Sequence, residues 1–360
     1  MSGLLFTQIS TTALFLLLLI TGIAAVTGDN RNIIRPINGR YAFILTIVVA
    51  VVMGSLPTEF GSDKYRYAQI FYQLTNNIID FDRDVGWLSY TELCSMVSFG
   101  DIRIYFLITA LLYTAGYYIF ARHYINKNYI WYFLLMTFGC IGFWGGGTNI
   151  LRAGLATSVI MVALTVHDRK LLSVILIIIA LELHKSMGII VMAFLLSKYC
   201  HKPKLFIAIW ICSLVISALN LTSDIHNYIN DLLGTVDERV GEYLTNDNDS
   251  IYKNAGFRTD FIIYSLIPII IGSRYIFKYK FRDTFYNTIY CTYLLVNSLW
   301  VIIIRIPYGD RFALLSWTFI PFIVLYPLLS RRLFKRQSLR IILYMTIFMG
   351  INLILTLEQV

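Results

Sequence analysis

Charged residues are scarce in this chain of 360 residues: Asp, Glu, Lys and Arg together make up 14% of it, while 58% is hydrophobic. A soluble domain usually has nearer a quarter of its residues charged. The composition therefore excludes an ordinary soluble domain and is typical of a polytopic membrane protein. Cysteine is also rare, and the five cysteines are scattered without a CxxC pair, so no disulfide framework is predicted.

Several common signatures are missing from the sequence. It contains no P-loop, no zinc signature and no dinucleotide fingerprint, so we expect no cofactor and no metal. It shows no internal repeat and no low-complexity linker, which favours a single membrane domain over residues 1–360. No basic patch is interleaved with stacking aromatic residues, so the net charge of +9 does not indicate nucleic-acid binding.

Apolar segments of membrane length account for nearly all of the chain. A helix needs about 20 apolar residues to cross a bilayer. The segment 171–197 is interrupted by Glu182, His184 and Lys185, so we expect two short spans meeting at a polar joint there. The sequence thus predicts an all-α bundle of about 12 transmembrane helices, at about 4–26, 41–57, 103–121, 129–145, 150–166, 171–181, 187–197, 205–221, 259–273, 285–304, 312–329 and 340–357.

Basic residues are concentrated in alternate joints between these spans. One set of joints holds 19 of the 30 Lys and Arg residues but only Asp29, Asp168 and Asp283 of the 21 acids. The positive-inside rule places this set in the cytoplasm, so both termini face the other side, called outward below. The first span has no basic region before it, and we expect it to be an uncleaved helix.

Two outward joints are long, at about 58–102 and 222–258. In the first, Tyr67, Ile70, Phe71 and Leu74 share one helical face, which predicts an amphipathic helix at the membrane interface. Residues 88–99 show a similar pattern. Such helices either cap the bundle or guide substrate. The second joint is polar and acidic, and is a candidate for a mobile lid.

Several cations fall on the outward side against the charge rule, namely Arg152, Lys185, Arg305 and Arg311. Arg152 follows the glycines 145–147 and begins a span. A charge at a membrane helix end indicates function by default, and a helix N-terminus attracts anions. The glycines would let a ligand approach the backbone closely. The alternative is an arginine that reaches out to lipid phosphate.

Two further groups fit the chemistry of an anionic substrate. His184 has the intrinsic pKa of a general base or a phosphate partner, although a hydrogen-bonded structural histidine is the plain alternative. Arg305 and Arg311 flank a turn containing Tyr308 and are spaced to hold a diphosphate. The alternative is an ion pair of either arginine with Asp310.

Acidic residues of the first outward joint have several candidate roles. Asp63 is either a base, a partner that orients an arginine, or a cap of the following helix. Asp80, Asp82 and Asp84 have the spacing of a DxD metal motif. Such spacing arises easily by chance in an acidic loop, so we predict no metal site.

Four sequence elements occur in one order and together carry a resemblance. They are Gly-Ser-Asp63-Lys-Tyr-Arg66-Tyr67, Asp84-Val-Gly-Trp87-Leu, Asn149-Ile-Leu-Arg152-Ala-Gly-Leu-Ala and Ala180-Leu-Glu-Leu-His184-Lys-Ser. This order resembles the EpsG family of bacterial polysaccharide polymerases, related to the Wzy O-antigen polymerases. The match covers about residues 58–200, and the C-terminal half fits only by hydropathy. The family's Glu is Asp84 here, and its aromatic residue before the histidine is Leu183.

The resemblance implies a GT-C-type helical bundle in the bacterial inner membrane, with its active site facing the periplasm. It implies a glycosyltransferase that moves a growing glycan from undecaprenyl diphosphate to the nonreducing end of another lipid-linked repeat unit. A chain-length regulator is a possible partner. The candidate catalytic residues are Arg152, His184 and Asp63. The candidate substrate-binding residues are Arg305, Arg311, Tyr308, Lys185, Arg66 and Trp87.

Three rival functions remain open at this point. A flippase or transporter suits twelve spans, but transporters usually place charges at the bilayer midplane, whereas these charges lie at outward helix ends. A membrane acyltransferase would be expected to carry His or Arg in its first span, and residues 4–26 have neither. An O-antigen ligase usually has its large outward loop late in the chain, whereas the long joints here are early and central.

Overall fold

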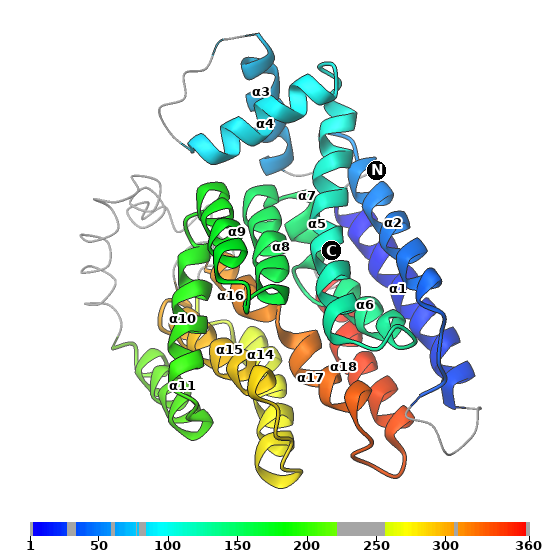
Figure 1. The fold of residues 1–360 in the computed structure, drawn as a ribbon, viewed down its shortest axis with the longest axis vertical. Coiled ribbons are helices and arrows are strands. Elements are labelled where there is room, and N and C mark those ends of the chain that lie inside the picture. The colour runs from blue at the N-terminus through cyan, green and yellow to red at the C-terminus, as the bar shows by residue number, and fades with distance from the viewer. Residues whose placement is uncertain are drawn as a thin grey trace. The chain divides into compact units, whose positions relative to one another are not determined.

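A computed structural model describes residues 3–26, 34–58, 62–76, 78, 84–221, 256–305 and 309–357. Every regular element in these ranges is a helix, which confirms the all-α prediction (Figure 1). The chain divides into two compact units, Met1–Gly188 with Val324–Val360, and Ile189–Ile323. The single membrane domain stays a prediction.

The first unit is built around a long central helix, α5, which packs against α2 and α8, while α8 also packs against α9. α5 and α8 cross closely because Gly116 has no side chain to separate them, and Ser158 Oγ donates to the carbonyl oxygen of Leu112 at 2.9 Å. α1 packs against α18. The bounds are α1 Gly3–Val26, α2 Gly39–Gly54, α5 Ile102–Tyr124, α8 Leu151–Thr165, α9 Lys170–Leu183 and α18 Gln337–Leu357.

The predicted span 129–145 is not one helix. It is divided into α6 (Ile130–Gly139) and the short α7 (Phe143–Thr148). Between them Gly142 has a φ of 84°, a left-handed conformation that glycine adopts readily and that ends a right-handed helix. The break sets α7 immediately before α8 and its first residues.

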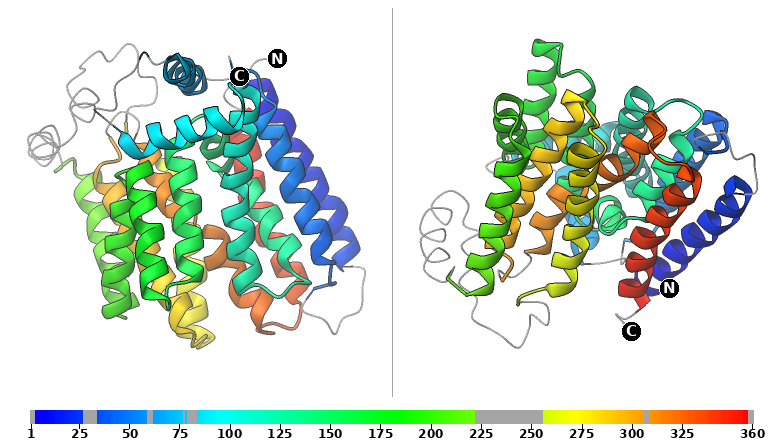
Figure 2. Two further views of the ribbon diagram at one scale, coloured as in Figure 1. Left: turned by 45° about the horizontal axis from the view of Figure 1, so that its top comes forward. Right: turned by 90° about the horizontal axis from the view of Figure 1, so that it is seen from below.

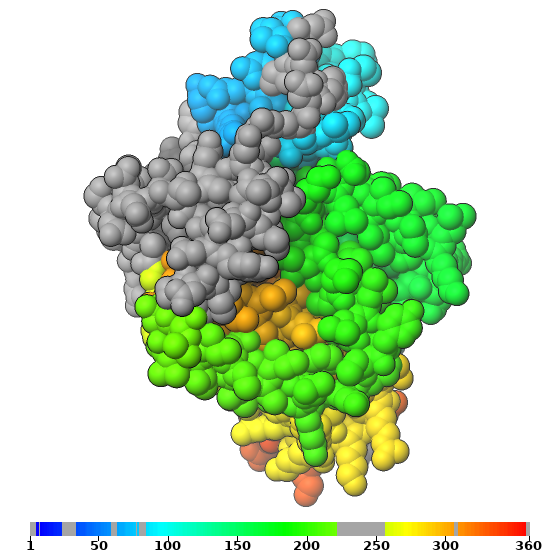
Figure 3. Space-filling view, turned by 90° about the vertical axis from the view of Figure 1, so that its left-hand side faces the viewer, coloured from blue at the N-terminus to red at the C-terminus, as the bar shows by residue number. Residues whose placement is uncertain are grey.

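Two helices of the first outward joint lie at one end of the first unit. They are α3 (Ser62–Thr75) and α4 (Val85–Val97), which pack against each other, and α4 crosses the ends of α5 and α9 (Figure 2). The space-filling view shows the pair as the blue and cyan surface at the end of this unit (Figure 3). Tyr67, Phe71 and Leu74 are buried, which confirms the predicted amphipathic face.

The core of the second unit contains a buried network of polar side chains that connects its helices. Asn297 of α15 donates to Ser265 Oγ at 3.1 Å and Ser316 Oγ at 2.9 Å, and accepts from Trp210 Nε1 at 2.7 Å. The amide of Asn297 thus links three further helices. The bounds are α11 Pro203–Ala218, α14 Thr259–Ser273 continuing as η1 Arg274–Lys278, α15 Thr284–Ile302 and α16 Asp310–Trp317; α10 (Met187–Tyr199) and α17 (Ile320–Ser330) each belong partly to both units.

Twelve full spans are not confirmed. Within the described ranges four helices are long and apolar enough to cross a membrane: Ile102–Tyr124, Thr259–Lys278, Asp310–Ser330 and Gln337–Leu357. Several shorter apolar helices accompany them, which is consistent with a polytopic membrane protein. The predicted pair of short helices meeting at a polar joint is confirmed, because α9 ends at Leu183 and α10 begins at Met187.

Candidate functional site

Arg152 forms an ion pair with Asp84, which the sequence places in a DxD spacing and at the position of the family's Glu. Arg152 is the second residue of α8, and Asp84 is the residue before α4. Nη1 of the arginine lies 2.5 Å from Oδ2 of the aspartate, and their side chains are 22% and 35% exposed. The Asp84 side chain makes no capping hydrogen bond to its own helix, and its carboxylate contacts the guanidinium instead.

The phenol of Tyr67 completes this cluster from α3. Its side chain is 8% exposed and interacts with Arg152 through a hydrogen bond and through charge. Burial raises the pKa of Tyr67, and the neighbouring Arg152 cation opposes that shift only in part. The phenol therefore stays neutral at physiological pH. We refer to Arg152, Asp84 and Tyr67 as the Arg152 cluster.

Asp63 lies beside this cluster, and the structure gives its backbone a defined partner. Its N–H donates to Oδ1 of Asn149 at 3.3 Å, which ties the first turn of α3 to the residues that precede α8. Asp63 stands inside the first turn of α3 rather than before it, so it is not the cap of that helix. It acts electrostatically on Tyr67, and its side chain is half-buried.

Gly86 brings the end of α9 to the same place. A Cβ atom on Gly86 would lie 2.5 Å from Cβ of Glu182 and 2.6 Å from its backbone oxygen. Only glycine permits this approach of α4 to α9. His184 follows two residues later and ends α9, with its N–H donating to the carbonyl oxygen of Ala180. The contact thus places the polar joint of α9 and α10 next to the start of α4.

Two of the three glycines before Arg152 allow close packing of neighbouring side chains against the backbone. Atoms of Tyr113 and Met53 occupy the positions where a Cβ on Gly146 or Gly147 would stand. Only at Gly145 is the space within 4 Å of an added Cβ open. Of the three glycines 145–147, only Gly145 therefore has open space in which a ligand could approach the backbone.

Lys64 is a buried cation that the sequence analysis did not single out. It is 1% exposed; its Nζ donates to the carbonyl oxygen of Leu56 at 2.8 Å and lies 4.4 Å from the ring centre of Phe106. Burial lowers the pKa of Lys64 to about 8. Its position three residues before Tyr67 and seven before Phe71 puts it on the buried face of α3, and this spacing was the one available signal.

Trp87 is buried between aromatic neighbours, and its substrate-binding role stays a prediction. It is 1% exposed, and its ring packs against Tyr67 at 5.3 Å and Tyr90 at 5.3 Å between ring centres. Trp87 thus packs against the same Tyr67 that interacts with Arg152. Arg66 and Lys185 are exposed, and Tyr308 lies outside the described residues.

The second unit carries its own outward cations. The Arg305 guanidinium lies 5.2 Å from the ring centre of Phe257 and 3.5 Å from the carbonyl oxygen of Ser217, so it does not form the alternative pair with Asp310. Arg311 is half-buried in the first turn of α16.

Arg258 was missed by the sequence analysis because it falls within the long second joint. It pairs with both carboxylate oxygens of Asp260, at 2.6 and 3.0 Å, and stacks on Phe261. Most of that joint, residues 222–255, lies outside the described residues, so the predicted lid stays a prediction.

The DxD prediction falls only partly on described residues. Asp80 and Asp82 lie outside them, and Asp84 is the partner of Arg152. In the ranges that the structure covers, no three His, Cys, Asp or Glu residues gather as a metal site would require.

Comparison with known proteins identifies the family. The model of the EpsG family matches residues 40–358, which extends well past the segment that carried the sequence resemblance. No curated protein and no solved structure matches the chain. Membership supports a role of the polysaccharide-polymerase kind in general, and the four matching elements supply the Arg152 cluster and its neighbours. The chain belongs to the EpsG family.

Proposed function

We propose that this protein is a membrane glycosyltransferase that polymerises undecaprenyl-diphosphate-linked repeat units at the periplasmic face of the bacterial inner membrane. The observation that carries the proposal is the Arg152 cluster, a partly exposed guanidinium held by Asp84 and Tyr67 at a helix end that the charge pattern predicts to face outward. EpsG membership supports the same reaction class.

In the proposed reaction the acceptor hydroxyl oxygen attacks the anomeric carbon of the donor glycan. The bond from that carbon to the diphosphate oxygen breaks, and undecaprenyl diphosphate leaves with the electron pair. A guanidinium has five N–H donors. Asp84 accepts from one terminal nitrogen of Arg152 and Tyr67 also hydrogen-bonds to this side chain, so further N–H groups are left for phosphate oxygens. Removing one such stabilising donor typically costs about 10²–10³ in rate.

A base that takes the hydroxyl proton would add about 10²–10⁴ in rate. His184 and Asp63 are the candidates, because both are half-buried and both lie on segments tied to the Arg152 cluster, one through Gly86 and the other through Asn149. Arg305 and Arg311 stay candidate diphosphate-binding residues of the second unit, while the exposed Arg66 and Lys185 are proposed to attract the anionic lipid.

The test is surface glycolipid from a deletion strain that is complemented with variants. Wild type should restore a ladder of repeat units, and Arg152→Ala should leave a band with one unit although the protein inserts normally. Arg103→Ala is the matched control. Arg103 is also the second residue of a helix, α5, at an end predicted to face outward, but its side chain is exposed.

A normal ladder from Arg152→Ala would remove Arg152 from the site. Loss of every band that carries a repeat unit in the deletion strain would instead point to a flippase or a ligase, and the polymerase would be abandoned.

A further inference from the structure

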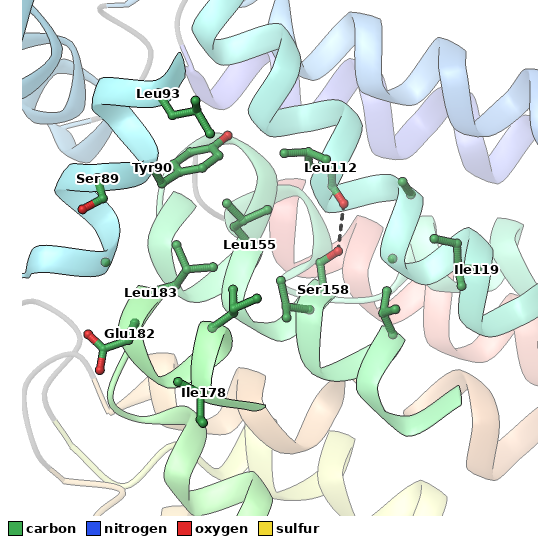
Figure 4. A pocket seen from close by; sticks show the side chains of 16 residues that line it. Ser89, Tyr90, Leu93, Leu112, Ile119, Leu155, Ser158, Ile178, Glu182 and Leu183 are labelled. Atoms are coloured by element: carbon green, nitrogen blue, oxygen red, sulfur yellow. Dashed lines mark hydrogen bonds between the residues drawn. The ribbon is translucent and has the colours of Figure 1, made fainter. Parts of the chain in front are cut away.

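A groove of about 530 Å³ lies between α4, α5, α8 and α9 (Figure 4). The surface of its lining is almost entirely apolar, and four of the lining residues are polar: Ser89, Tyr90, Ser158 and Glu182. The hydroxyl of Ser158 donates to the carbonyl oxygen of Leu112, and the hydroxyl of Tyr90 is hydrogen-bonded to Thr109 at 2.8 Å, whereas Ser89 and Glu182 are exposed. The volume of the groove is in the range of small-molecule sites. The groove is therefore suited to hydrocarbon.

The groove begins next to the Arg152 cluster. Gly86 at the start of α4 and Glu182 near the end of α9 both line it, and Gly86 is two residues from Asp84. On α8 the lining runs from Leu155 to Val162, a distance of about 10 Å along a helix. Leu155 is one turn past Arg152 and on the same side of the helix. A molecule lying in the groove would thus have one end at a charged pair and the rest among apolar side chains.

The walls of the groove continue into exposed apolar surface. Leu112 is 46% exposed, Ile178 53% and Ile179 44%, which is expected where apolar helices meet lipid. Above them α4 crosses the helix ends and contributes Leu93, itself 60% exposed. The groove is accordingly open sideways, so that a lipid chain can enter it without passing through water.

We propose that this groove binds the isoprenoid tail of an anionic polyprenyl diphosphate, in the stretch next to the diphosphate. The inference rests on the proposed function for the position of the head group at Arg152. A polyprenyl diphosphate combines the two properties that the groove requires, an anionic head for the cation and a hydrocarbon chain for the aliphatic walls. Anionic phospholipid also combines charge with hydrocarbon, but its charge lies on a phosphodiester rather than on a terminal diphosphate, and the experiment distinguishes the two sources.

The first test uses a photoreactive amino acid at Ile179, which lines the groove, or at Ile175, one turn away. Both positions are 44% exposed on α9, so they meet the bilayer equally. The full chain is placed in nanodiscs with labelled undecaprenyl diphosphate. We expect at least about five-fold more labelled adduct from position 179, and unlabelled undecaprenyl diphosphate should suppress it. Equal labelling, or only phospholipid adducts at 179, would overturn the inference.

The second test fills the groove. Ala115→Phe on α5 should raise the KM for a long-tailed donor at least about five-fold, with kcat and the KM for a short-tailed donor unchanged, and Ile175→Phe should change neither. Labelling at 179 without any sugar transfer would refute the polymerase and leave the groove intact. Normal transfer without labelling would refute the groove alone. If Ala115→Phe does not fold, the labelling test decides.

Discussion

The carboxylate of Asp84 and the guanidinium of Arg152 meet at 2.5 Å although 68 residues separate them in the chain. This pair joins the start of α4 to the start of α8. The pair holds the Arg152 guanidinium in one orientation, and in the proposed reaction such preorganised charge would stabilise the transition state.

Asp84→Asn is expected to lower kcat about ten-fold, since the amide keeps the shape but loses the charge that holds Arg152 in place. Arg152→Ala should cost about 10² or more. Because Asp84 acts through Arg152, the double variant should be no slower than Arg152→Ala alone. Sugar transfer in proteoliposomes measures all three. Asp101→Asn, at another helix start, is the control. Losses that simply add would show that Asp84 has a separate role.

Gly86→Ala should separate α4 from α9, because the new methyl group would overlap the backbone of Glu182 at 2.6 Å. Overpacking against backbone typically costs about 1–3 kcal/mol. We expect a lower melting temperature in detergent together with loss of transfer. Gly188→Ala is matched to it, as the added carbon would stand 3.6 Å from a Leu181 methyl, an ordinary contact. Equal melting temperatures of the two variants would show that α4 can move away from α9 at little cost in stability.

Lys64 makes the stability of the fold depend on pH. Its pKa is about 8 when folded and near 10.5 when exposed, so the unfolded chain binds more protons between these values. The free energy of unfolding therefore rises with pH across this window, by about 3 kcal/mol for a shift of this size. Thermal unfolding should therefore show that the stability of wild type relative to Lys64→Met increases when the pH is raised from about 7 to about 10.

The exposed Lys127→Met serves as the control for Lys64 and should follow wild type at both pH values. A constant difference between wild type and Lys64→Met would mean that Lys64 keeps its proton in the fold. It would then be a permanent buried cation, held by Leu56 and Phe106.

The pH dependence of transfer identifies the base. If His184 accepts the proton, the rate of transfer should fall on the acidic side of neutrality, where imidazole becomes charged. His184→Gln should then remove this acidic limb of the pH–rate profile. Asp63→Asn should then keep the limb. The reverse result, with the limb intact in His184→Gln and activity lost in Asp63→Asn, would assign the base to Asp63. His167→Gln, on a residue of the α8–α9 joint, is the control.

The sequence by itself determined that the chain is helical and membrane-embedded, and it singled out Arg152. Both follow from rules that act residue by residue: apolar length decides what can lie in lipid, and a charge at a helix end is costly enough to need a reason. The buried face of α3 and the break after Leu183 were predicted in the same way, from periodicity and from polar residues in an apolar run.

Only the tertiary structure decided what surrounds Arg152. Three features depend on which helix ends come into contact: the pairing of Arg152 with Asp84, the burial of Lys64 and the burial of Trp87. Those meetings are set by contacts between distant segments, such as Asn149 with Asp63 and Gly86 with Glu182. Local periodicity carries no information about such contacts, because a helix has the same pattern whichever neighbour its buried face finds.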